Sequence, residues 1–384
     1  MNLPNPSEPS DRLVVGAAIV SHGRVLAARR TDPVDLAGGW EFPGGKVEQD
    51  ETPEQACVRE VREELGCEVR GVGELAGPAV LRPGWVLRVL VVELTGVEPV
   101  PHEHDAIRWL DPEELLDCPW LAADAPFLPE LREMLLDGSP LVGGNVGGAV
   151  RIGHTVRRPT GAWSAAVHAL LDHLAAAGLD GIPHVLGTDA RGREVLTYLP
   201  GRSIDVDEEV AGDEVLAEAM RWLRRFHDAV RDFAPPPGAQ WRNGGELQPG
   251  QLVCHHDAGA YNWAVVDGHF AGIYDWDMAG PGVELDDLAF TAWNSVPLAL
   301  VIPDDDVVRR LRLMVREYGA YSPVEVLDAV DRRIGSATDK ITAGQRAGDP
   351  GMLNLARVGE PQRTLERLDV MRLRLPALRA TLKS

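Results

Sequence analysis

Three glutamates lie close together on one predicted helix, and their spacing suits the binding of a metal ion. Glu60, Glu63 and Glu64 fall at positions i, i+3 and i+4, so their carboxylates share one arc of the helix. Like charges this close destabilise a helix unless something positive lies among them. A hard divalent cation such as Mg²⁺ or Mn²⁺ prefers oxygen ligands of this kind. The alternative interpretation is a solvated helix face that binds nothing.

The helix that carries these glutamates has clear start and stop signals. Thr52 can cap its first turn, Pro53 suits the first helical position, and Gln55 completes a capping box. Gly66 can end the helix in a left-handed conformation. These signals predict a helix over Pro53–Leu65, with the glutamates on an arc separate from its apolar stripe.

The spacing of this segment resembles the Nudix box. That pattern is a Gly, five residues, a Glu, seven residues, and then Arg-Glu-U-x-Glu-Glu-x-Gly-U, where U is bulky and aliphatic. Gly45, Glu51 and residues 59–67 match it at every specified position but the last, where Cys67 stands. The resemblance covers about residues 13–136, and residues 40–46, Trp-Glu-Phe-Pro-Gly-Gly-Lys, are similar to the segment before the box in the MutT-like branch.

The resemblance implies a role for several residues of this chain. In the Nudix family the box glutamates and the carbonyl of the glycine before the box hold divalent ions. The ion implied here is Mg²⁺, with Mn²⁺ as the alternative. The implied metal ligands here are Gly44, Glu60, Glu63 and Glu64. A glutamate further along the chain often assists metal binding or water activation, and Glu103 stands where it is expected. The implied catalytic residues are therefore Glu60, Glu63, Glu64 and Glu103.

The same resemblance implies a substrate site and a reaction. Substrate contacts come from Arg30, from the segment Glu41, Phe42, Pro43 and Gly44, and from a base-recognising residue that corresponds by position to Asp124. Members directed to 8-oxoguanine carry Asn there. Because a carboxylate only accepts hydrogen bonds, Asp124 suits an N–H edge of guanine or the amino group of cytosine, and the base stays open. The implied activity is Mg²⁺-dependent hydrolysis of a nucleoside triphosphate to monophosphate and pyrophosphate, with 8-oxo-dGTP as the family-typical substrate.

A second group of chemically capable residues lies between Cys254 and Asp287. Asp257 precedes Asn262 by five positions, and Asp275 follows a predicted hairpin turn. An Asp and an Asn at this spacing suit a catalytic loop that accepts a hydroxyl proton and holds Mg²⁺. Together with the runs at 273–277 and 280–282, the segment resembles the aminoglycoside-phosphotransferase-like branch of the protein-kinase fold, over about residues 142–384.

Carried over from that branch, Asp257 is the base, Asn262 and Asp275 are Mg²⁺ ligands, and Asp277 assists. The implied partners are ATP and a small hydroxyl acceptor. This gives an alternative main activity, ATP-dependent O-phosphotransfer, with the Nudix domain accessory or regulatory. Two further alternatives remain open: a degenerate binding or scaffold domain, and one domain acting as a ligand sensor for the other.

The segment also departs from the phosphotransferase pattern. Its amino-terminal lobe is abbreviated, and the glycines between Gly143 and Gly148 only loosely resemble a nucleotide loop. A Val-Ala-x-Lys strand is missing, so Arg157 or Arg158 is the only candidate cation for the nucleotide phosphates. Arg clamps phosphate but is not interchangeable with Lys. The predicted helix Trp163–Ala177 offers no clear Glu partner for it.

These sites require two domains of different kinds. The expected fold class is α+β: a Nudix α/β/α sandwich over residues 1–137, then a mostly helical kinase-like domain with an abbreviated N-lobe over 138–384. Predicted strands of the first domain cover residues 13–20, 24–30, 86–94 and 106–110, and a closing helix covers 126–136. The second domain is predicted to have helices over 163–177 and 215–230, strands over 194–198, 264–266 and 270–274, and mostly helix from about 305.

Composition limits the classes of partner. The 384 residues include 38 Lys and Arg against 59 Asp and Glu, a formal net charge of −21. Such a field repels nucleic-acid polymers, while a phosphorylated small molecule can still bind with a metal ion. Four scattered cysteines and no apolar run of membrane-spanning length indicate a cytoplasmic protein without membrane partners. The isolated histidines form no convincing metal-ligand spacing: His102, His104, His154, His168, His173, His184 and His269.

Overall fold

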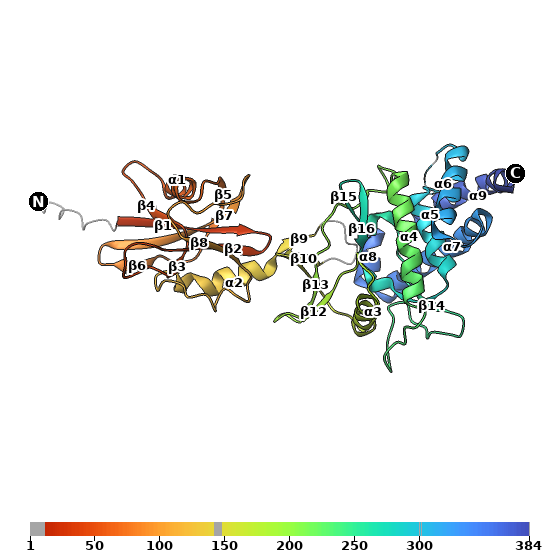
Figure 1. The fold of residues 1–384 in the computed structure, drawn as a ribbon, viewed down its shortest axis with the longest axis horizontal. Coiled ribbons are helices and arrows are strands. Elements are labelled where there is room, and N and C mark those ends of the chain that lie inside the picture. Colours follow the sequence, from red (N-terminus) through yellow and green to blue (C-terminus); the bar gives the residue numbers. More distant parts are fainter. Residues whose placement is uncertain (1–11, 142–147, 299, 301, 384) are drawn as a thin grey trace, which may run out of the picture. The chain divides into compact units, whose positions relative to one another are not determined.

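The computed structural model describes residues 12–141, 148–298, 300 and 302–383, and these form two compact units (Figure 1). The first unit holds residues 12–141 together with Val150–Thr155. The second holds 148–149 together with 156–383. Across the helices of these described residues, none combines the length and the apolar character needed to cross a membrane.

An eight-stranded sheet forms the centre of the first unit. Its main path runs β3-β2-β1-β7-β5, while β4 pairs with β1, β6 with β7 and β8 with β2. Strands β1 and β7 are parallel, and the other pairs of this sheet are antiparallel. A short antiparallel pair, β9 and β10, belongs to the same unit. The strands are β1 (Arg12–Ser21), β2 (Arg24–Arg29), β3 (Trp40–Glu41), β4 (Gly44–Lys46), β5 (Val69–Glu74), β6 (Ala79–Arg82), β7 (Trp85–Leu94), β8 (Ala106–Leu110), β9 (Ser139–Pro140) and β10 (Val150–Ile152).

Alternating side chains of β1 build two cores, one on each face of the sheet. Val15 and Ala17 pack in the core that includes the buried face of α1 (Pro53–Leu65). Ala18 points to the opposite face, where the core includes α2 (Leu128–Asp137). Because successive residues of a strand face opposite sides, each helix covers one face. The α/β/α sandwich expected for this region is present.

Helix α1 has the ends that the sequence predicts. The Oγ1 atom of Thr52 accepts from the backbone N–H of Gln55 at 3.3 Å, and the Gln55 side chain accepts from the Thr52 N–H at 2.9 Å. Gly66 adopts φ of 63° and donates its N–H to the Arg62 carbonyl at 3.0 Å. These contacts fix where the helix starts, and hence the direction in which its glutamates point.

The predicted closing helix over 126–136 is wrong at its start. Residues Ala125–Phe127 form a separate 3₁₀ turn, and α2 begins only at Leu128. Pro126 and Pro129 each occupy a first-turn position, because proline has no N–H to donate to a continuing helix. One predicted helix thus becomes a 3₁₀ turn followed by an α-helix.

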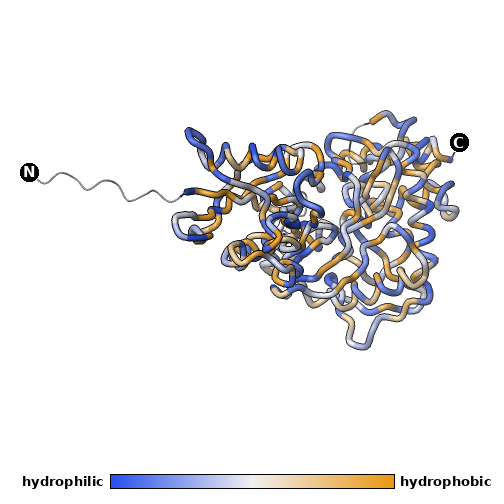
Figure 2. The backbone as a smooth tube through the Cα atoms, turned by 60° about the vertical axis from the view of Figure 1, so that its left-hand side comes forward, coloured by the Kyte–Doolittle hydropathy of each residue, from blue (hydrophilic) through white to orange (hydrophobic). Residues whose placement is uncertain are grey.

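The second unit is rich in helices, with short strands between them. In Figure 2 these helices show hydrophilic and hydrophobic residues in alternation, as helices with one buried face do. The helices are α3 (Ser164–Ala176), α4 (Asp213–Ala229), α5 (Glu284–Ser295), α6 (Asp304–Tyr318), α7 (Pro323–Ala347), α8 (Pro350–Arg357) and α9 (Gln362–Lys383). The strands are β11 (Thr155–Arg158), β12 (Val185–Thr188), β13 (Glu194–Thr197), β14 (Leu252–Cys254), β15 (Trp263–Val266), β16 (His269–Ile273) and β17 (Gly280–Gly282).

The strands of the second unit place its polar residues. Neighbouring strands β12, β13 and β11 form one layer, β15 and β16 form an antiparallel hairpin, and β14 pairs with β17. The turn of the hairpin lies at Asp267 and Gly268, both with positive φ, as the sequence predicts. One continuous apolar core joins β13–β16 to helices α3–α7 and α9. Candidate site residues lie at or just beyond the strand ends.

Candidate active sites

In the first unit an acidic hollow is lined by residues of β4 and α1. Gly44, Glu60, Glu63 and Glu64 all line it. The backbone N–H of Gly44 donates to Oε2 of Glu64 at 2.8 Å. A Cβ atom at Gly45 would lie 2.3 Å from Oε1 of Glu60, so a larger residue here would displace this carboxylate. The predicted metal ligands therefore lie together around one open space.

Arg59 is the positive group among the three glutamates. Its guanidinium lies 2.9 Å from Glu60 and 3.3 Å from Glu63, and it also binds Glu51 at 3.0 Å. Sequence reasoning offered only an ion from solution for this position. The arginine holds Glu51 and Glu60 in place but makes no ion pair with Glu64 in the described structure. One cation thus serves several carboxylates, and the hollow keeps an excess of negative charge.

Burial disfavours the charged form of two of these acids. Burial raises the pKa of Glu64 to about 7, although the charge of His104 and the Gly44 N–H act in the opposite direction. The pKa of Glu60 is also raised by burial, against the effect of Arg59. Glu63 is exposed. Carboxylates that are costly to ionise, open to a common space and short of counter-ions form a donor set that fits a hard divalent cation.

A second cluster in this unit joins Arg30, Glu41 and His104. Arg30 donates from Nη1 to Oε2 of Glu41 at 2.6 Å, and Nε2 of His104 lies 3.2 Å from the other oxygen. Burial lowers the pKa of His104, but the hydrogen bond with Glu41 and the charge of Glu64 raise it overall. His104 is buried and was not predicted as a site residue. Its place directly after Glu103 was the available signal.

Asp124 lies beside the strand that carries the predicted substrate contacts. Its side chain is buried, with 4% of the residue exposed, and its Oδ1 accepts a long bond of 3.4 Å from the Phe42 N–H. Burial raises the pKa of Asp124 to about 7. The rings of Phe42 and Trp120 lie 4.7 Å apart and give this region an aromatic wall. Arg30, Glu41, Phe42 and Asp124 are thus neighbours.

The two remaining predicted residues of this unit play different structural parts. Pro43 is buried, and its carbonyl accepts from the N–H of Ala17 at 2.8 Å, which anchors the loop to β1. Glu103 is exposed, and its carbonyl accepts from Oγ1 of Thr31 at 3.1 Å. The Glu103 charge contributes to the raised pKa of Glu60, so its side chain lies near that carboxylate, although it does not line the hollow.

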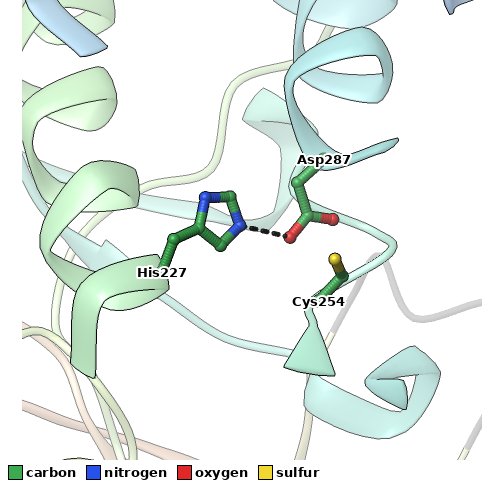
Figure 3. Close-up of side chains that lie close together, drawn as sticks. All are labelled: His227, Cys254 and Asp287. Atoms are coloured by element: carbon green, nitrogen blue, oxygen red, sulfur yellow. Dashed lines mark hydrogen bonds and ion pairs between the residues drawn. The ribbon is translucent and has the colours of Figure 1, made fainter. Parts of the chain in front are cut away.

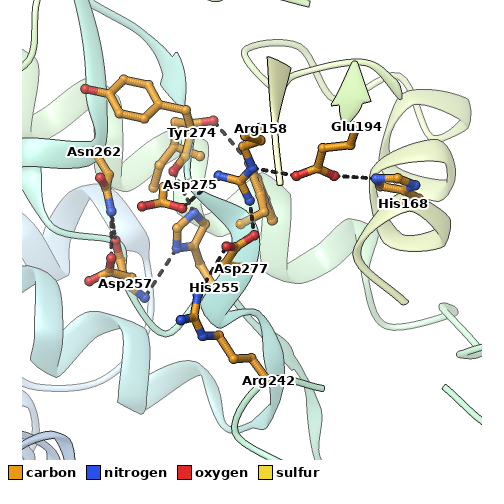
Figure 4. A network of polar contacts seen from close by, with 12 residues as sticks. Arg158, His168, Glu194, Arg242, His255, Asp257, Asn262, Tyr274, Asp275 and Asp277 are labelled. Atoms are coloured by element: carbon orange, nitrogen blue, oxygen red, sulfur yellow. Dashed lines mark hydrogen bonds and ion pairs between the residues drawn. The ribbon is translucent and has the colours of Figure 1, made fainter. Parts of the chain in front are cut away.

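In the second unit Asp257, Asn262 and Asp275 lie together (Figure 4). Nδ2 of Asn262 donates to Oδ2 of Asp257 at 2.9 Å, and the Tyr261 hydroxyl donates to the other oxygen. Burial, and then the charge of Asp275, raise the pKa of Asp257 to about 7. Asp275 itself adopts a left-handed conformation with φ of 63°, an uncommon one for aspartate.

Arg158 is the cation at this second site. It donates from Nη1 to Asp275 at 3.0 Å and from Nε to Glu194 at 2.5 Å, and it also binds Asp277 (Figure 4). The other oxygen of Glu194 lies 2.5 Å from Nε2 of His168 on α3. The acidic partner that was sought on the helix therefore comes from β13. The other candidate, Arg157, instead has its guanidinium 3.6 Å from the carboxylate of Asp189. Residues 143–147 of the glycine segment lie outside the described residues.

Asp287 holds the segment just before Asp257 through two hydrogen bonds to its backbone. Its two oxygens accept from the backbone N–H groups of His255 at 2.8 Å and His256 at 2.7 Å. Burial raises the pKa of Asp287, but the hydrogen bond and charge of His227 lower it overall. Asp287 was missed by sequence reasoning, because its partners lie about thirty residues away in the chain.

His227, Cys254 and Asp287 also meet as a group of metal-ligand types (Figure 3). Each of them already has a partner within the protein. His227 binds Asp287 at 3.1 Å and the Tyr318 hydroxyl at 2.8 Å, and the Cys254 thiol donates to the Val283 carbonyl at 3.2 Å. These contacts explain the cluster as a structural one, which fixes the loop at His255 and His256.

Comparison with known proteins identifies the first unit. Residues 11–131 match the NUDIX domain. Putative 8-oxo-dGTP diphosphatase 2 of Mycobacterium tuberculosis is 41% identical over 128 residues, which cover 33% of this chain and 91% of that protein. CTP pyrophosphohydrolase of Escherichia coli is 43% identical over 123 residues, which cover 30% of this chain and 87% of that protein.

A third relative matches a longer stretch of the chain. Trifolitoxin immunity protein of Rhizobium leguminosarum bv. trifolii is 36% identical over 178 residues, 45% of this chain and 66% of that protein. The chain thus spans just under two thirds of that relative. Because 45% of the chain exceeds the length of the first unit, the similarity includes part of the second. Through its first unit, the chain belongs to the Nudix hydrolase family.

Proposed function

We propose that residues 1–137 form a Mg²⁺-dependent nucleoside triphosphate pyrophosphohydrolase of the MutT type. The observation that carries this proposal is the hollow in which Gly44, Glu60, Glu63 and Glu64 face one another. The acids that line it, these three and Glu48, outnumber the lining cations, Lys46 and Arg59. Within the described structure the second unit instead balances its central acids with Arg158 and Arg242.

The chain's own residues account for the steps of this reaction. Glu60, Glu63, Glu64 and the Gly44 carbonyl would hold the ion, which when bound offsets negative charge on the phosphate oxygens. A carboxylate at the hollow accepts a proton from the attacking water, and Glu64 and Glu103 are the candidates. The water oxygen bonds to one of the two phosphorus atoms that share the α–β bridging oxygen. The bond between that phosphorus and the bridging oxygen breaks, and nucleoside monophosphate and pyrophosphate are released.

The base of the substrate would lie against Phe42 and Asp124. The two relatives named for a substrate act on 8-oxo-dGTP and on CTP. An ionised Asp124 accepts from the amino group of cytosine, whereas a protonated one also donates to a carbonyl oxygen. Because the pKa of Asp124 lies near 7, both forms are accessible. CTP, dCTP and 8-oxo-dGTP are therefore the substrates to compare first.

The test is a panel of these nucleotides with Mg²⁺, scored for pyrophosphate against orthophosphate. We expect pyrophosphate from the wild type and at least about 100-fold less from Glu64→Gln. Glu54→Gln is the matched control, because Glu54 lies exposed on the same helix outside the hollow. Retained turnover in Glu64→Gln, or equal loss in Glu54→Gln, would contradict the assignment.

A second activity is favoured by the convergence of Asp257, Asn262, Asp275 and Arg158. We infer that residues 138–384 form an aminoglycoside-phosphotransferase-like domain that uses ATP and a small hydroxyl acceptor. Asn262 and Asp275 would hold Mg²⁺. Asp257 accepts the hydroxyl proton, the acceptor oxygen bonds to the γ-phosphorus, and the bond between that phosphorus and the β–γ bridging oxygen breaks to release ADP.

Asp257→Asn with labelled ATP tests this activity. Transfer of label to an acceptor should disappear in the variant, while pyrophosphate release by the first unit stays unchanged. Trifolitoxin belongs among the acceptors to try, because the relative whose similarity includes part of the second unit is named trifolitoxin immunity protein. Label transfer that survives Asp257→Asn would contradict the role of this residue.

A further inference from the structure

A cavity of about 450 Å³ lies in the second unit beside Asp257 and Asp275. That volume is in the range of sites for small molecules. Apolar side chains from α5 and α8, such as Phe290, Trp293 and Leu355, form part of its wall. The remaining wall carries charged groups from α7 and α9. The cavity thus joins the candidate acid–base residue to a surface that can select a ligand by charge.

Three of the five cations that line the cavity already have carboxylate partners. Arg242 lies 3.2 Å from Asp277, and both Arg363 and Arg367 bind Asp207. These pairs cancel much of the local charge. They leave Arg333 and Lys340 as the lining cations without an ion pair in the described part of the chain.

Arg333 is buried yet incompletely satisfied. Only 8% of the residue is exposed, and its Nη2 donates to the His256 carbonyl in the loop before Asp257. The guanidinium lies 4.7 Å from the centre of the Phe290 ring. Its Nε is buried and has no hydrogen-bond partner. A buried charge with an unused hydrogen-bond donor is costly, even though the Asp257 carboxylate lies near enough to interact with it electrostatically.

Lys340 adds a second positive charge on the same side of the cavity. It lies seven residues after Arg333, two turns along α7, and both side chains line the cavity. Burial, and then the neighbouring charge of Arg333, lower the pKa of Lys340. Among the lining acids, Glu360 accepts from the Thr364 N–H at 3.2 Å at the start of α9 rather than binding either cation.

We propose that this cavity binds a small hydroxyl compound that carries a carboxylate or a phosphate, with the anionic group held by Arg333 and Lys340. A guanidinium with a free donor matches either anion through paired hydrogen bonds, and the lysine contributes a further charge. The hydroxyl end of the ligand would face Asp257. That this compound accepts a phosphoryl group rests on the proposed phosphotransfer. Its binding does not, because binding needs neither ATP nor metal.

Calorimetry of the full-length protein in EDTA tests this binding with four matched sugars. Glucose 6-phosphate and gluconate are the anionic probes, glucose is neutral, and glucosamine is cationic. We expect at least one anionic probe to bind roughly tenfold more tightly than glucose and glucosamine. The two anionic arms show whether phosphate or carboxylate is preferred. Arg333→Gln and Lys340→Gln should each weaken that binding by about tenfold.

The matched control is Arg332→Gln. Arg332 is the adjacent arginine on α7, exposed and lying 3.6 Å from Asp286, and it does not line the cavity. Its substitution should leave binding unchanged. Lys340→Gln keeps the test decisive if Arg333→Gln fails to fold, because Lys340 is more exposed than Arg333. Lack of binding by both anionic probes, or equal binding of glucosamine, would overturn the proposal. Anion binding without any label transfer would instead contradict only the phosphotransfer.

Discussion

The two units hold clusters of carboxylates that are balanced in opposite ways. In the first, the box glutamates Glu60, Glu63 and Glu64 share one arginine, Arg59, which also binds Glu51. In the described structure the Glu64 carboxylate accepts a hydrogen bond from the backbone N–H of Gly44. Negative charge therefore exceeds positive charge around an open hollow.

In the second unit, arginines already hold the acids. Arg158 contacts Glu194, Asp275 and Asp277, and Arg242 contacts Asp277 from another side. Such a cluster is stable without a metal ion but depends strongly on its cations. The first cluster has the reverse property. Because its acids are in excess, we expect a divalent cation to stabilise it.

The largest expected effect follows removal of Arg158. In Arg158→Ala, buried Glu194 loses its arginine and Asp277 keeps only Arg242, so the free energy of unfolding of the second unit should fall by about 3–5 kcal/mol. Arg158→Lys should recover only part of this lost stability, because a lysine ammonium cannot bind three carboxylates at once as the planar guanidinium does. Urea unfolding measures both. Arg202→Ala, which removes an exposed pair with Glu209, should cost less than about 1 kcal/mol. Equal losses in the two alanine variants would contradict the comparison.

A somewhat smaller effect is expected from Mg²⁺ on the first unit. At 100 times its dissociation constant, the ion should raise the free energy of unfolding by about 2.7 kcal/mol. The double variant Glu60→Gln and Glu64→Gln should lose this gain. Thermal unfolding with and without Mg²⁺ measures it, and Glu54→Gln serves as the control. A gain that persists in the double variant would show that the ion binds elsewhere.

The arrangement of α1 was predictable from sequence because it depends on neighbours. Thr52, Gln55 and Gly66 act within four residues of their partners, and alternation along β1 fixes its two faces. The contacts of Arg158 with Glu194 and Asp277 join residues 36 and 119 positions apart. Local patterns carry no information at that distance, so these pairs appeared only in the structure.

The box also shows why residue types alone can mislead. Three glutamates on one arc predict a cation, and two sources fit: an ion or a nearby arginine. The structure places Arg59 there, one residue before Glu60. His104 and Asp287 were missed for a related reason. Their importance comes from burial against distant carboxylate or backbone partners.

A further prediction concerns the pH dependence of stability through Asp124. Because burial raises its pKa from 3.8 to about 7, the unfolded chain ionises first, and stability falls as pH rises from about 4 through 7. Asp124→Asn removes this loss. It should therefore stabilise the first unit by about 2 kcal/mol more at pH 8 than at pH 5.

Thermal unfolding at the two pH values measures this difference. Asp117→Asn is the control, because Asp117 is exposed in the preceding segment. It should give the same change in Tm at both pH values. An Asp124→Asn effect that does not vary with pH would mean that this carboxyl titrates normally.

The smallest expected effect belongs to Glu103. It is exposed, and its carbonyl rather than its side chain makes the contact with Thr31. Glu103→Gln should reduce pyrophosphate release by less than about tenfold if Glu64 accepts the proton of the attacking water. Steady-state rates for CTP measure this. A loss as large as that in Glu64→Gln would assign the proton transfer to Glu103 instead.

The central claim is that the uncompensated acids of the first unit perform pyrophosphohydrolysis independently of the second. Pyrophosphate release from CTP and 8-oxo-dGTP, measured with Mg²⁺ in the full-length protein, tests it most directly. We expect release from the wild type and from Asp257→Asn at equal rates, and almost none from Glu64→Gln. Release that disappears in Asp257→Asn and persists in Glu64→Gln would contradict the account.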